Sequence, residues 1–551
     1  MTDSPALRKA RGAFFTPREM CHFLAQWAIR STDDSVLEPS CGEAAFLMAS
    51  GERLAALGST PQQVAHGLHG VEMHAGSALA AGALLRDAGW ASEIRTADFF
   101  DCPAEPTYDA VIGNPPYIRY QHFAGEARSK ALRATLAQGV RVSGLASAWA
   151  PFVVHAAAFL KPTGRLGLVL PAELLSVNYA AEIRRYLLNR FASVRLVTFE
   201  DRVFPGVLEE VVLLLAEGQG PAPCFEVYQA RGLSDLEHPD RSAWTWYRPD
   251  AHGKWTPALV QSEAMEVYRE ACDGPHFEAL ADWGETYLGA VTGNNAYFTM
   301  SAEKAAAHGL SARDLRPISP PGSKHLRGLT FASAAWKALR DQGDACFLFA
   351  PDPEHPSTAA RRYIAQGEKH GVHATYKCRM RRPWWRVPLV EKPDLLLTYM
   401  DHARPRLTAN TAGIDILNSL YGVRLVSGRR RLGQRLLPLA AINSLTLLGA
   451  EIVGRSYGGG MLKLEPKEAG RLPLPSLQVL EAMDARLDPH RDILGDALRV
   501  ERLADIVRTV DQIILVEAMG MRADEIRTIR DARELLFERR VTRGKTGRAV
   551  D

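Results

Sequence analysis

Short apolar segments alternate with stretches of helical spacing all the way from Ser35 to Ala216. Strands that are apolar on both faces and separated by helices belong to mostly parallel sheets with both faces covered. We therefore predict an α/β domain with a seven-stranded, mostly parallel, Rossmann-like sheet. The seven expected strands lie at residues 36–38, 67–72, 94–98, 110–113, 166–170, 194–199 and 211–215.

The chain has 551 residues, which is too long for a single hydrophobic core. A Gly- and Pro-rich stretch at Glu217–Pro223 ends the alternation, and the βα rhythm is lost after about residue 250. From Pro475 onward the spacing of apolar residues becomes helical again. We expect an α/β domain at 1–245, an irregular α+β domain at 246–475 and a C-terminal helical region at 476–551.

Composition narrows the class of protein. The net charge of +3 excludes a polybasic tail but permits a local basic face on a nucleic-acid binder. The seven cysteines form no C-x-x-C pair, so we expect no disulfide framework and no metal site. The chain start lacks a signal-type apolar core, and no run approaches the roughly 18 apolar residues of a membrane span. We expect a soluble, cytoplasmic protein.

The segment Asn114-Pro115-Pro116-Tyr117 follows directly after the expected strand at 110–113. Two prolines cannot continue a strand, so the backbone leaves the sheet here and presents its carbonyls outward. An amide, outward carbonyls and a flat ring together suit the capture of a planar amine, such as an extruded nucleobase. A Pro-rich turn without function is the alternative for an isolated segment of this kind.

Polar groups also follow the first three expected strands. These are Glu38-Pro39-Ser40-Cys41-Gly42, Glu72 and Asp98-Phe99. Ligands of open parallel sheets bind beyond the carboxyl ends of the strands. Gly42 is the only glycine of the first loop, which argues against a pyrophosphate and for a nucleoside that carries an amino acid. Each carboxylate alone suits a helix cap or a surface charge, but the set favours a binding site.

In this order the motifs resemble those of the S-adenosylmethionine-dependent adenine-N6 DNA methyltransferases of type II restriction-modification systems. The closest group is the gamma group of TaqI-like and PstI-like enzymes, in which cofactor motifs precede the NPPY motif and a target-recognition domain comes last. The resemblance covers nearly the whole chain and implies a methyltransferase sheet followed by a recognition domain. One departure is His74-Ala75, where the family often has Asp-Pro.

The resemblance also assigns residues to roles. Thr16, in the segment 12–17, reaches the methionine carboxylate, Glu72 the ribose and Asp98 the adenine, while Phe204 packs against the flipped base. The implied cofactor-binding residues are Thr16, Glu38, Pro39, Cys41, Glu72, Asp98, Phe99, Asn114 and Pro116. The implied catalytic residues are Asn114, Pro115, Pro116, Tyr117 and Phe204.

The expected chemistry is a methyl transfer to a base amine. The side-chain carbonyl of Asn114 and the main-chain carbonyl of Pro115 hold both amine hydrogens and localise the nitrogen lone pair for in-line transfer. No metal and no dedicated base are required. The base must leave the duplex, at a cost of a few kcal/mol, and stacking on Tyr117 and Phe204 offsets part of that cost.

Basic and aromatic residues mix in the second part of the chain, in the segment 376–386 and around 429–435. Cations bind phosphates, and arginine also reads guanine edges. A solvated charged face beside core tryptophans is an equal alternative for either cluster. The candidate DNA-binding residues are Arg379, Arg381, Arg382, Trp384, Arg429, Arg430 and Lys463.

We therefore expect a site-specific DNA adenine-N6 methyltransferase acting on duplex DNA, with a cognate restriction endonuclease as a possible partner. An RNA or protein-glutamine methyltransferase with the same amine-capturing motif is the first alternative. The roughly 300 residues that follow the catalytic domain argue against it. A catalytically silent DNA-binding specificity subunit is the alternative from another class, and an added nuclease activity is less favoured.

Overall fold

The computed structural model describes most of the chain: residues 16–201, 203–204, 210–239, 243–249, 253–457, 459–499 and 502–545. It divides into two compact units, Met1–Leu259 and Val260–Asp551. The division lies later in the chain than the expected domain boundary at 245, because strand β9 (Thr245–Tyr247) still pairs with the sheet of the first unit.

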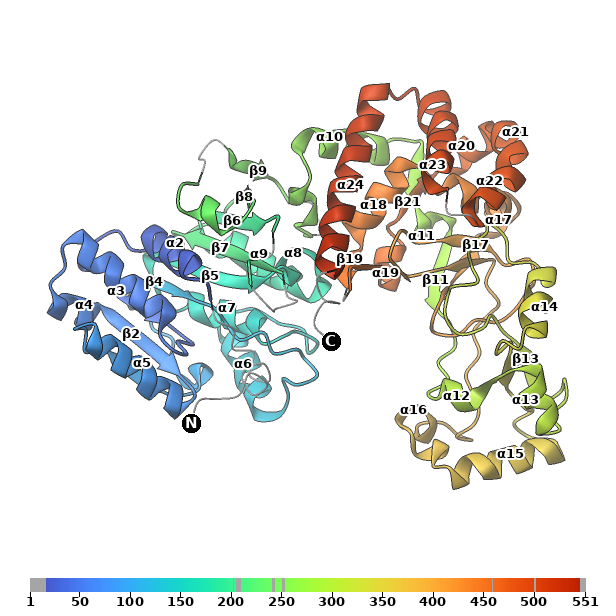
Figure 1. The fold of residues 1–551 in the computed structure, drawn as a ribbon, viewed down its shortest axis with the longest axis horizontal. Helices are drawn as coiled ribbons and strands as arrows, with labels where there is room; N and C mark the ends of the chain where they lie inside the picture. The colour runs from blue at the N-terminus through green and yellow to red at the C-terminus, as the bar shows by residue number, and fades with distance from the viewer. Residues whose placement is uncertain are drawn as a thin grey trace. The chain divides into compact units, whose positions relative to one another are not determined.

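The first unit is built on one mixed sheet with the strand order β3-β2-β1-β4-β5-β7-β6-β8-β9 (Figure 1). Its strands are β1 (Val36–Glu38), β2 (Leu68–Glu72), β3 (Glu93–Thr96), β4 (Tyr108–Gly113), β5 (Leu160–Pro171), β6 (Ser193–Phe199), β7 (Val211–Glu217), β8 (Phe225–Ala230) and β9. The expected α/β class and all seven expected strands are confirmed. The sheet has nine strands rather than seven, because β8 and β9 extend it beyond β6.

The central strands are parallel, and β7 runs antiparallel between β5 and β6. Six helices pack on the strands of the sheet: α2 (Arg18–Ala28), α3 (Ala45–Leu57), α4 (Pro61–Gly67), α5 (Ala75–Asp87), α7 (Trp149–Ala157) and α9 (Ala181–Arg190). Helix α6 (Gly125–Ala137) packs on α7. All nine residues of α7 are buried.

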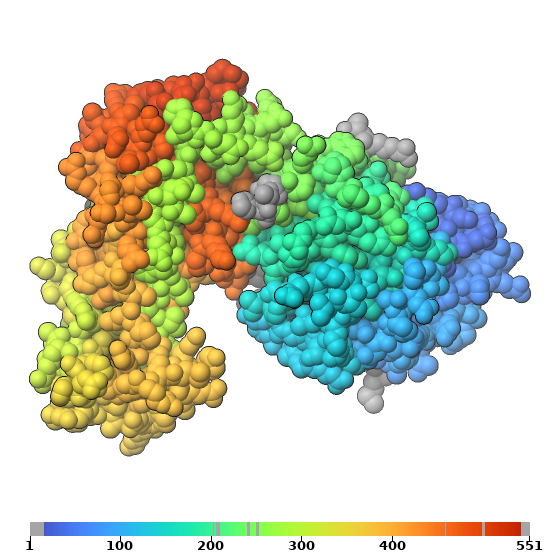
Figure 2. All heavy atoms as spheres, turned by 180° about the vertical axis from the view of Figure 1, so that it is seen from behind, coloured from blue at the N-terminus to red at the C-terminus, as the bar shows by residue number. Residues whose placement is uncertain are grey.

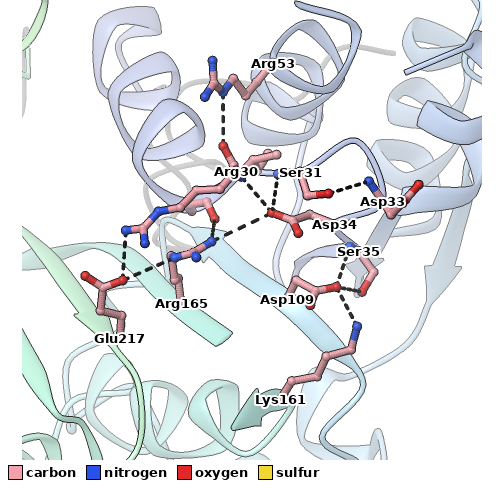
Figure 3. Close-up of polar contacts among 12 residues, drawn as sticks. Arg30, Ser31, Asp33, Asp34, Ser35, Arg53, Asp109, Lys161, Arg165 and Glu217 are labelled. Carbon is pink, nitrogen blue, oxygen red and sulfur yellow. Dashed lines mark hydrogen bonds and ion pairs between the residues drawn. The ribbon is translucent and has the colours of Figure 1, made fainter. Parts of the chain in front are cut away.

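A polar network ties together the edge of the sheet at which β1, β4 and β5 begin (Figure 3). Asp109 accepts hydrogen bonds from the main-chain N–H and the hydroxyl of Ser35, both at 3.0 Å, and from Lys161 Nζ at 2.7 Å. Nearby, Arg165 donates to the Ala28 carbonyl at 2.8 Å. This edge lies opposite the carboxyl ends of β1 and β4, so we assign it to stability.

We expect Asp109→Asn to lower stability in a pH-dependent way. Burial alone would raise the pKa of the Asp109 carboxyl, but hydrogen bonds from Lys161 and Ser35 outweigh it and lower the pKa. A lowered folded-state pKa adds stability above the unfolded value, near 3.9, and this is lost as the pH falls through the folded-state value. Urea unfolding should show a deficit of roughly 1 kcal/mol at pH 7 that shrinks below about pH 4. A deficit independent of pH would contradict this account.

The second unit is α+β, as expected, with several small sheets in the described residues. Their strand orders are β11-β18-β15-β17, β12-β14-β13, β16-β20-β19 and β10-β21. The strands are β10 (Phe277–Ala279), β11 (Gly284–Leu288), β12 (Thr299–Met300), β13 (Leu315–Pro317), β14 (Phe347–Phe349), β15 (Leu395–Leu397), β16 (Met400–Asp401), β17 (Leu407–Ala409), β18 (Tyr421–Leu425), β19 (Arg455–Tyr457), β20 (Met461–Lys463) and β21 (Pro473–Pro475).

Helices α10 (Ser262–Asp273), α17 (Arg430–Ala440), α18 (Ser444–Val453), α20 (Leu477–Ala482), α22 (Arg491–Arg499), α23 (Leu503–Asp511) and α24 (Ala523–Lys545) complete the core of this unit. The region after residue 476 is helical, yet it shares one core with the sheet: Ile506 and Ile514 belong to the same buried cluster as Val423 and Leu436. Among the described residues no single helix is long and apolar enough to cross a membrane, and only the bent pair Ser427–Ala440 and Ser444–Val453 meets those criteria jointly.

Candidate active site

The strand order reverses direction between β1 and β4, which are neighbours in the middle of the sheet. In open α/β sheets this switch point opens a crevice at the carboxyl ends of the strands, where ligands bind. The loop Pro39–Gly42 follows β1 and the Asn114–Tyr117 turn follows β4. The topology therefore brings the two main sequence motifs to one end of one sheet.

Asn114 is held by its amide nitrogen. Its Nδ2 donates a hydrogen bond of 3.1 Å to Oγ1 of the buried Thr16, which lies just before α2. Its Oδ1 is buried and has no hydrogen-bond partner within the described residues. A buried oxygen without a donor costs about 1–3 kcal/mol, so this oxygen is an acceptor ready for a ligand. The rest of the expected N-terminal motif, residues 12–15, lies outside the described residues.

Tyr117 is also fixed in place. Its hydroxyl donates to the main-chain carbonyl of Val169 on β5 at 2.9 Å. Its half-buried ring packs against the core cluster that contains the buried Phe204. Pro115 is buried and Pro116 half-buried. These contacts hold the turn in place. Pro205, which follows Phe204 in the chain, lies outside the described residues.

Glu72, at the end of β2, organises the loops around it. Its two carboxylate oxygens accept hydrogen bonds from the main-chain N–H groups of Gly42, at 2.9 Å, and His74, at 2.8 Å. A carboxylate has about four acceptor positions, so Glu72 keeps capacity for further donors such as hydroxyls. The His74 that departs from the family pattern contributes through its main chain.

Glu38 is a buried carboxyl at the end of β1. Its Oε2 accepts a hydrogen bond of 3.0 Å from the N–H of Leu47 in the first turn of α3. Burial raises the pKa of Glu38 well above its usual value, and the nearby Glu72 adds to the rise. Cys41 is buried and its N–H donates to the Val71 carbonyl at 2.9 Å. These residues shape the loop after β1.

Asp98 and Phe99 follow β3. Asp98 accepts a hydrogen bond of 3.0 Å from the N–H of Phe100, and Lys130 Nζ lies 3.8 Å from its other oxygen. The Phe99 ring is buried against Phe152 and other aromatic side chains, with ring centroids 4.8 Å apart. One oxygen of Asp98 is therefore occupied by the N–H of Phe100, and the Phe99 ring is part of the core.

His155 contributes to this region and was not expected from the sequence. It lies on the buried helix α7, and its Nε2 is 3.1 Å from the Phe99 carbonyl. Burial lowers the pKa of His155, so the ring is neutral near pH 7. It holds the main chain next to Asp98 in place. A lone histidine in an apolar helix was the only sequence signal for this role.

Ala44, in the turn before α3, has a left-handed backbone with φ of 65°, and no other non-glycine residue of the described chain has a positive φ. This conformation costs an L-residue roughly 1–2 kcal/mol. Ala44→Gly relieves this strain, and the larger loss of chain entropy of glycine on folding offsets part of the gain, so we expect the free energy of unfolding to rise by up to about 1 kcal/mol. Ala44→Val should lower it. Urea titration of both variants tests this; a stabilised valine variant would contradict it.

The expected DNA-binding residues fall into two groups. Arg381 donates to the Thr292 carbonyl at 2.8 Å and to the Val291 carbonyl, and burial lowers its pKa. Arg379 and Arg382 are exposed. Arg381 thus holds two segments of the second unit together, whereas its two neighbours face solvent.

The other candidate DNA-binding residues form ion pairs or hydrogen bonds with carboxylates of the protein itself. Arg429 pairs with Glu278, Arg430 with the buried Asp394 at 2.6 Å and Lys463 with Glu465 at 3.0 Å. Trp384 donates to Glu368 at 3.0 Å and packs against the core around Tyr297. The partners of Arg429, Arg430 and Trp384 lie 16 to 151 positions away in the sequence, so no local pattern reveals those contacts.

Comparison with known proteins finds a matching family for each of the two parts of the chain. Residues 4–227 match the N-6 DNA methylase family, and residues 252–515 match the C-terminal domain of the type II methyltransferase M.Eco57I. The type II methyltransferase M.XamI of Xanthomonas campestris pv. amaranthicola is 25% identical over 86% of each chain. M.AccI of Acinetobacter calcoaceticus is 20% identical over 92% of this chain and 93% of its own.

One solved structure, the type IIG restriction endonuclease BpuSI, aligns over 97% of this chain and 66% of its own, with 14% identity and a TM-score of 0.41. The two family models follow one another along the chain in the order that the motifs predict. Residues 4–227 therefore belong to the N-6 DNA methylase family, and the chain is a DNA methyltransferase that resembles those of type II restriction-modification systems.

Proposed function

We propose that the protein transfers the methyl group of S-adenosylmethionine to N6 of an adenine that has been turned out of duplex DNA, and that Asn114 and Pro115 hold the amine. The observation that carries the proposal is the buried, unpartnered Oδ1 of Asn114 at the switch point of the sheet. The main-chain carbonyl of Pro115 also receives no hydrogen bond from the described residues. Two free acceptors match the two hydrogens of an adenine amine.

The residues around the β1 loop fit S-adenosylmethionine. Gly42 has a positive φ of 50°, and a Cβ added there would meet nothing within 4 Å, so the loop leaves open space. Glu72 retains acceptor capacity for ribose hydroxyls, and one oxygen of Asp98 for the adenine amine. The loop has no glycine-rich phosphate cradle, as suits a cofactor without phosphates. When bound, S-adenosylmethionine supplies an electrophilic methyl group on sulfur.

Asn114 and Pro115 then raise the reactivity of the amine. Its nitrogen lone pair is delocalised into the purine ring, which makes it a poor nucleophile. Two acceptors that hold the N–H groups favour a tetrahedral nitrogen with a localised lone pair. Thr16 keeps the Asn114 amide in the orientation that this requires. The proton is lost after the transfer, so positioning and electrostatics supply most of the rate.

Tyr117 and Phe204 stabilise the extruded base. Unstacking costs a few kcal/mol, and a base stacked on an aromatic ring recovers roughly 1–3 kcal/mol. The bond from the Tyr117 hydroxyl to Val169 sets the plane of that ring before DNA binds. A fixed ring loses less conformational entropy on binding than a mobile one.

We further propose that the chain has the gamma-group order of motifs and protects its host DNA against a cognate restriction endonuclease in the cytoplasm. The names of the relatives, type II methyltransferases M.XamI and M.AccI, support the restriction-modification role, and the gamma-group order rests on the order of the sequence motifs.

Methylation-sensitive sequencing tests the proposal. The protein is expressed in cells without endogenous adenine methylation, and the genomic DNA should carry N6-methyladenine in one sequence context. Purified protein should also transfer a tritiated methyl group to duplex DNA in preference to tRNA or a release factor. Unmodified adenines, or label in the RNA or protein, would overturn it.

A further inference from the structure

One segment of the second unit is far more basic than the rest of the chain. Residues 358–386 contain eight Lys or Arg residues but only one acidic residue, Glu368, whereas the whole chain has a net charge of +3. The segment comprises α15 (Thr358–Lys369), α16 (Tyr376–Arg379) and the turn after them. Both helices lie at the same end of the second unit (Figure 1), and this end is at the molecular surface (Figure 2).

Several cations elsewhere in this unit are paired with acids. Arg424 contacts Glu285 and Glu391, and Arg435 contacts Asp484 and Asp488. Such pairs leave little positive charge for an external partner.

The cations around α16 have no such neutralisation. Lys377 and Arg379 lie over the ring of Tyr376, with their charged groups 5.7 and 5.4 Å from its centroid. Arg382 donates only to the carbonyls of Arg379 and Arg381, at 3.1 and 2.9 Å. Within the described residues no carboxylate pairs with Lys377, Arg379 or Arg382. Three exposed charges therefore remain available.

Two large apolar side chains stand among these charges. Tyr376 is 62% exposed and Met380 is 68% exposed. Tyr376 begins α16 and Met380 directly follows its last residue with an αR backbone, so the two side chains lie about one helical turn apart. Exposed aromatic and thioether groups framed by cations suit a polyanion with apolar faces, and duplex DNA presents stacked bases and thymine methyl groups between two rows of phosphates.

The backbone beneath this face is rigid. The buried Cys378 contacts the Thr292 carbonyl, with its Sγ 3.9 Å away, and Arg381 donates to the same carbonyl. Gly293 has a positive φ, and a Cβ added there would lie 2.7 Å from the Cβ of Lys377. The helix is therefore clamped onto the Thr292-Gly293 segment. Rigid support of this kind is what a recognition surface needs.

We propose that Tyr376, Lys377, Arg379, Met380 and Arg382, together the α16 surface, bind duplex DNA, with the cations on phosphates and Tyr376 and Met380 against the bases. The inference rests on the proposed function, since it takes duplex DNA as the substrate. It replaces Arg381, Arg429, Arg430, Trp384 and Lys463 as DNA contacts with exposed residues that have no carboxylate partner within the described chain.

The charge contribution is tested by the salt dependence of binding. Each phosphate contact adds about 0.9 to the slope of log affinity against log salt. The double variant Lys377→Gln/Arg379→Gln should therefore bind a duplex containing the methylated sequence more weakly, with a slope shallower by about 2. The matched control is Arg424→Gln, an exposed but paired cation, which should keep the wild-type slope. A wild-type slope for the double variant would overturn the proposal.

The apolar contribution is tested separately. Tyr376→Ala/Met380→Ala should bind the same duplex roughly 5- to 150-fold more weakly, as expected for the loss of one base contact, with an unchanged salt slope. All variants should have the circular dichroism spectrum and the urea-unfolding transitions of the wild type, which shows that the second unit folds. Wild-type DNA affinity of this variant would show that Tyr376 and Met380 do not contact the bases. If wild-type protein methylates DNA while both double variants bind normally, only the α16 surface fails; if wild-type protein does not methylate DNA, the proposed function fails.

Discussion

Asn114→Ala should abolish methylation while S-adenosylmethionine still binds. The substitution removes the buried Oδ1 that has no partner within the described chain, and with it one of the two acceptors for the amine. Loss of one preorganised hydrogen-bonding group at a reacting centre typically costs a factor of about 10²–10³ in rate. A tritiated-methyl assay measures the rate, and calorimetric titration measures cofactor binding.

The matched control for this variant is Asn189→Ala, because Asn189 is an exposed asparagine on α9. It should methylate DNA at the wild-type rate. Full activity of Asn114→Ala would show that the amine is held by other groups. Loss of cofactor binding together with activity would instead assign Asn114 to the cofactor.

Arg540→Met should destabilise the second unit by about 3–5 kcal/mol. Arg540, on α24, is 4% exposed and pairs with Glu451 on α18, itself 5% exposed, at 2.6 Å. Arg540 also donates to the carbonyl of His402 at 3.0 Å. The variant leaves the Glu451 carboxylate buried without its cation. Urea unfolding followed by tryptophan fluorescence should show an earlier transition.

The double variant Arg540→Met/Glu451→Met separates the pair from the packing of the helix. Removal of both charges leaves no uncompensated ion, so the loss should be much smaller than for Arg540→Met alone. Equal losses in the two variants would mean that the ion pair itself contributes nothing, and that the arginine acts only through its contacts with main-chain carbonyls.

The sequence predicted the first unit well because its signals are local. Each of the seven expected strands is a short apolar run ended by turn residues, and periodicity reveals such runs directly. Strands β8 and β9 were missed because they follow the Gly- and Pro-rich stretch Glu217–Pro223, which ends the alternation of apolar and helical segments on which the strand predictions rest. The division between units was placed too early for the same reason.

The polar residues at the strand ends were predicted as a group, but the hydrogen bonds that each of them forms were not. That Glu72 lies at a strand end follows from the pattern; that it accepts N–H groups from Gly42 and His74 does not. The candidate DNA contacts show the same limit. Arg381 and Arg382 are neighbours in sequence, yet one binds carbonyls of Val291 and Thr292 and the other faces solvent.

The amino-acid sequence by itself determined the α/β sheet, the order of the motifs and hence the reaction class, because apolar periodicity and strand-end residues are properties of adjacent positions. Only the tertiary structure decided which groups stay free to act: the oxygen of Asn114 lacks a partner within the described residues, whereas Arg429 and Arg430 have one. The physical reason is that hydrogen bonds and ion pairs join residues tens to hundreds of positions apart, and only folding brings those atoms within reach.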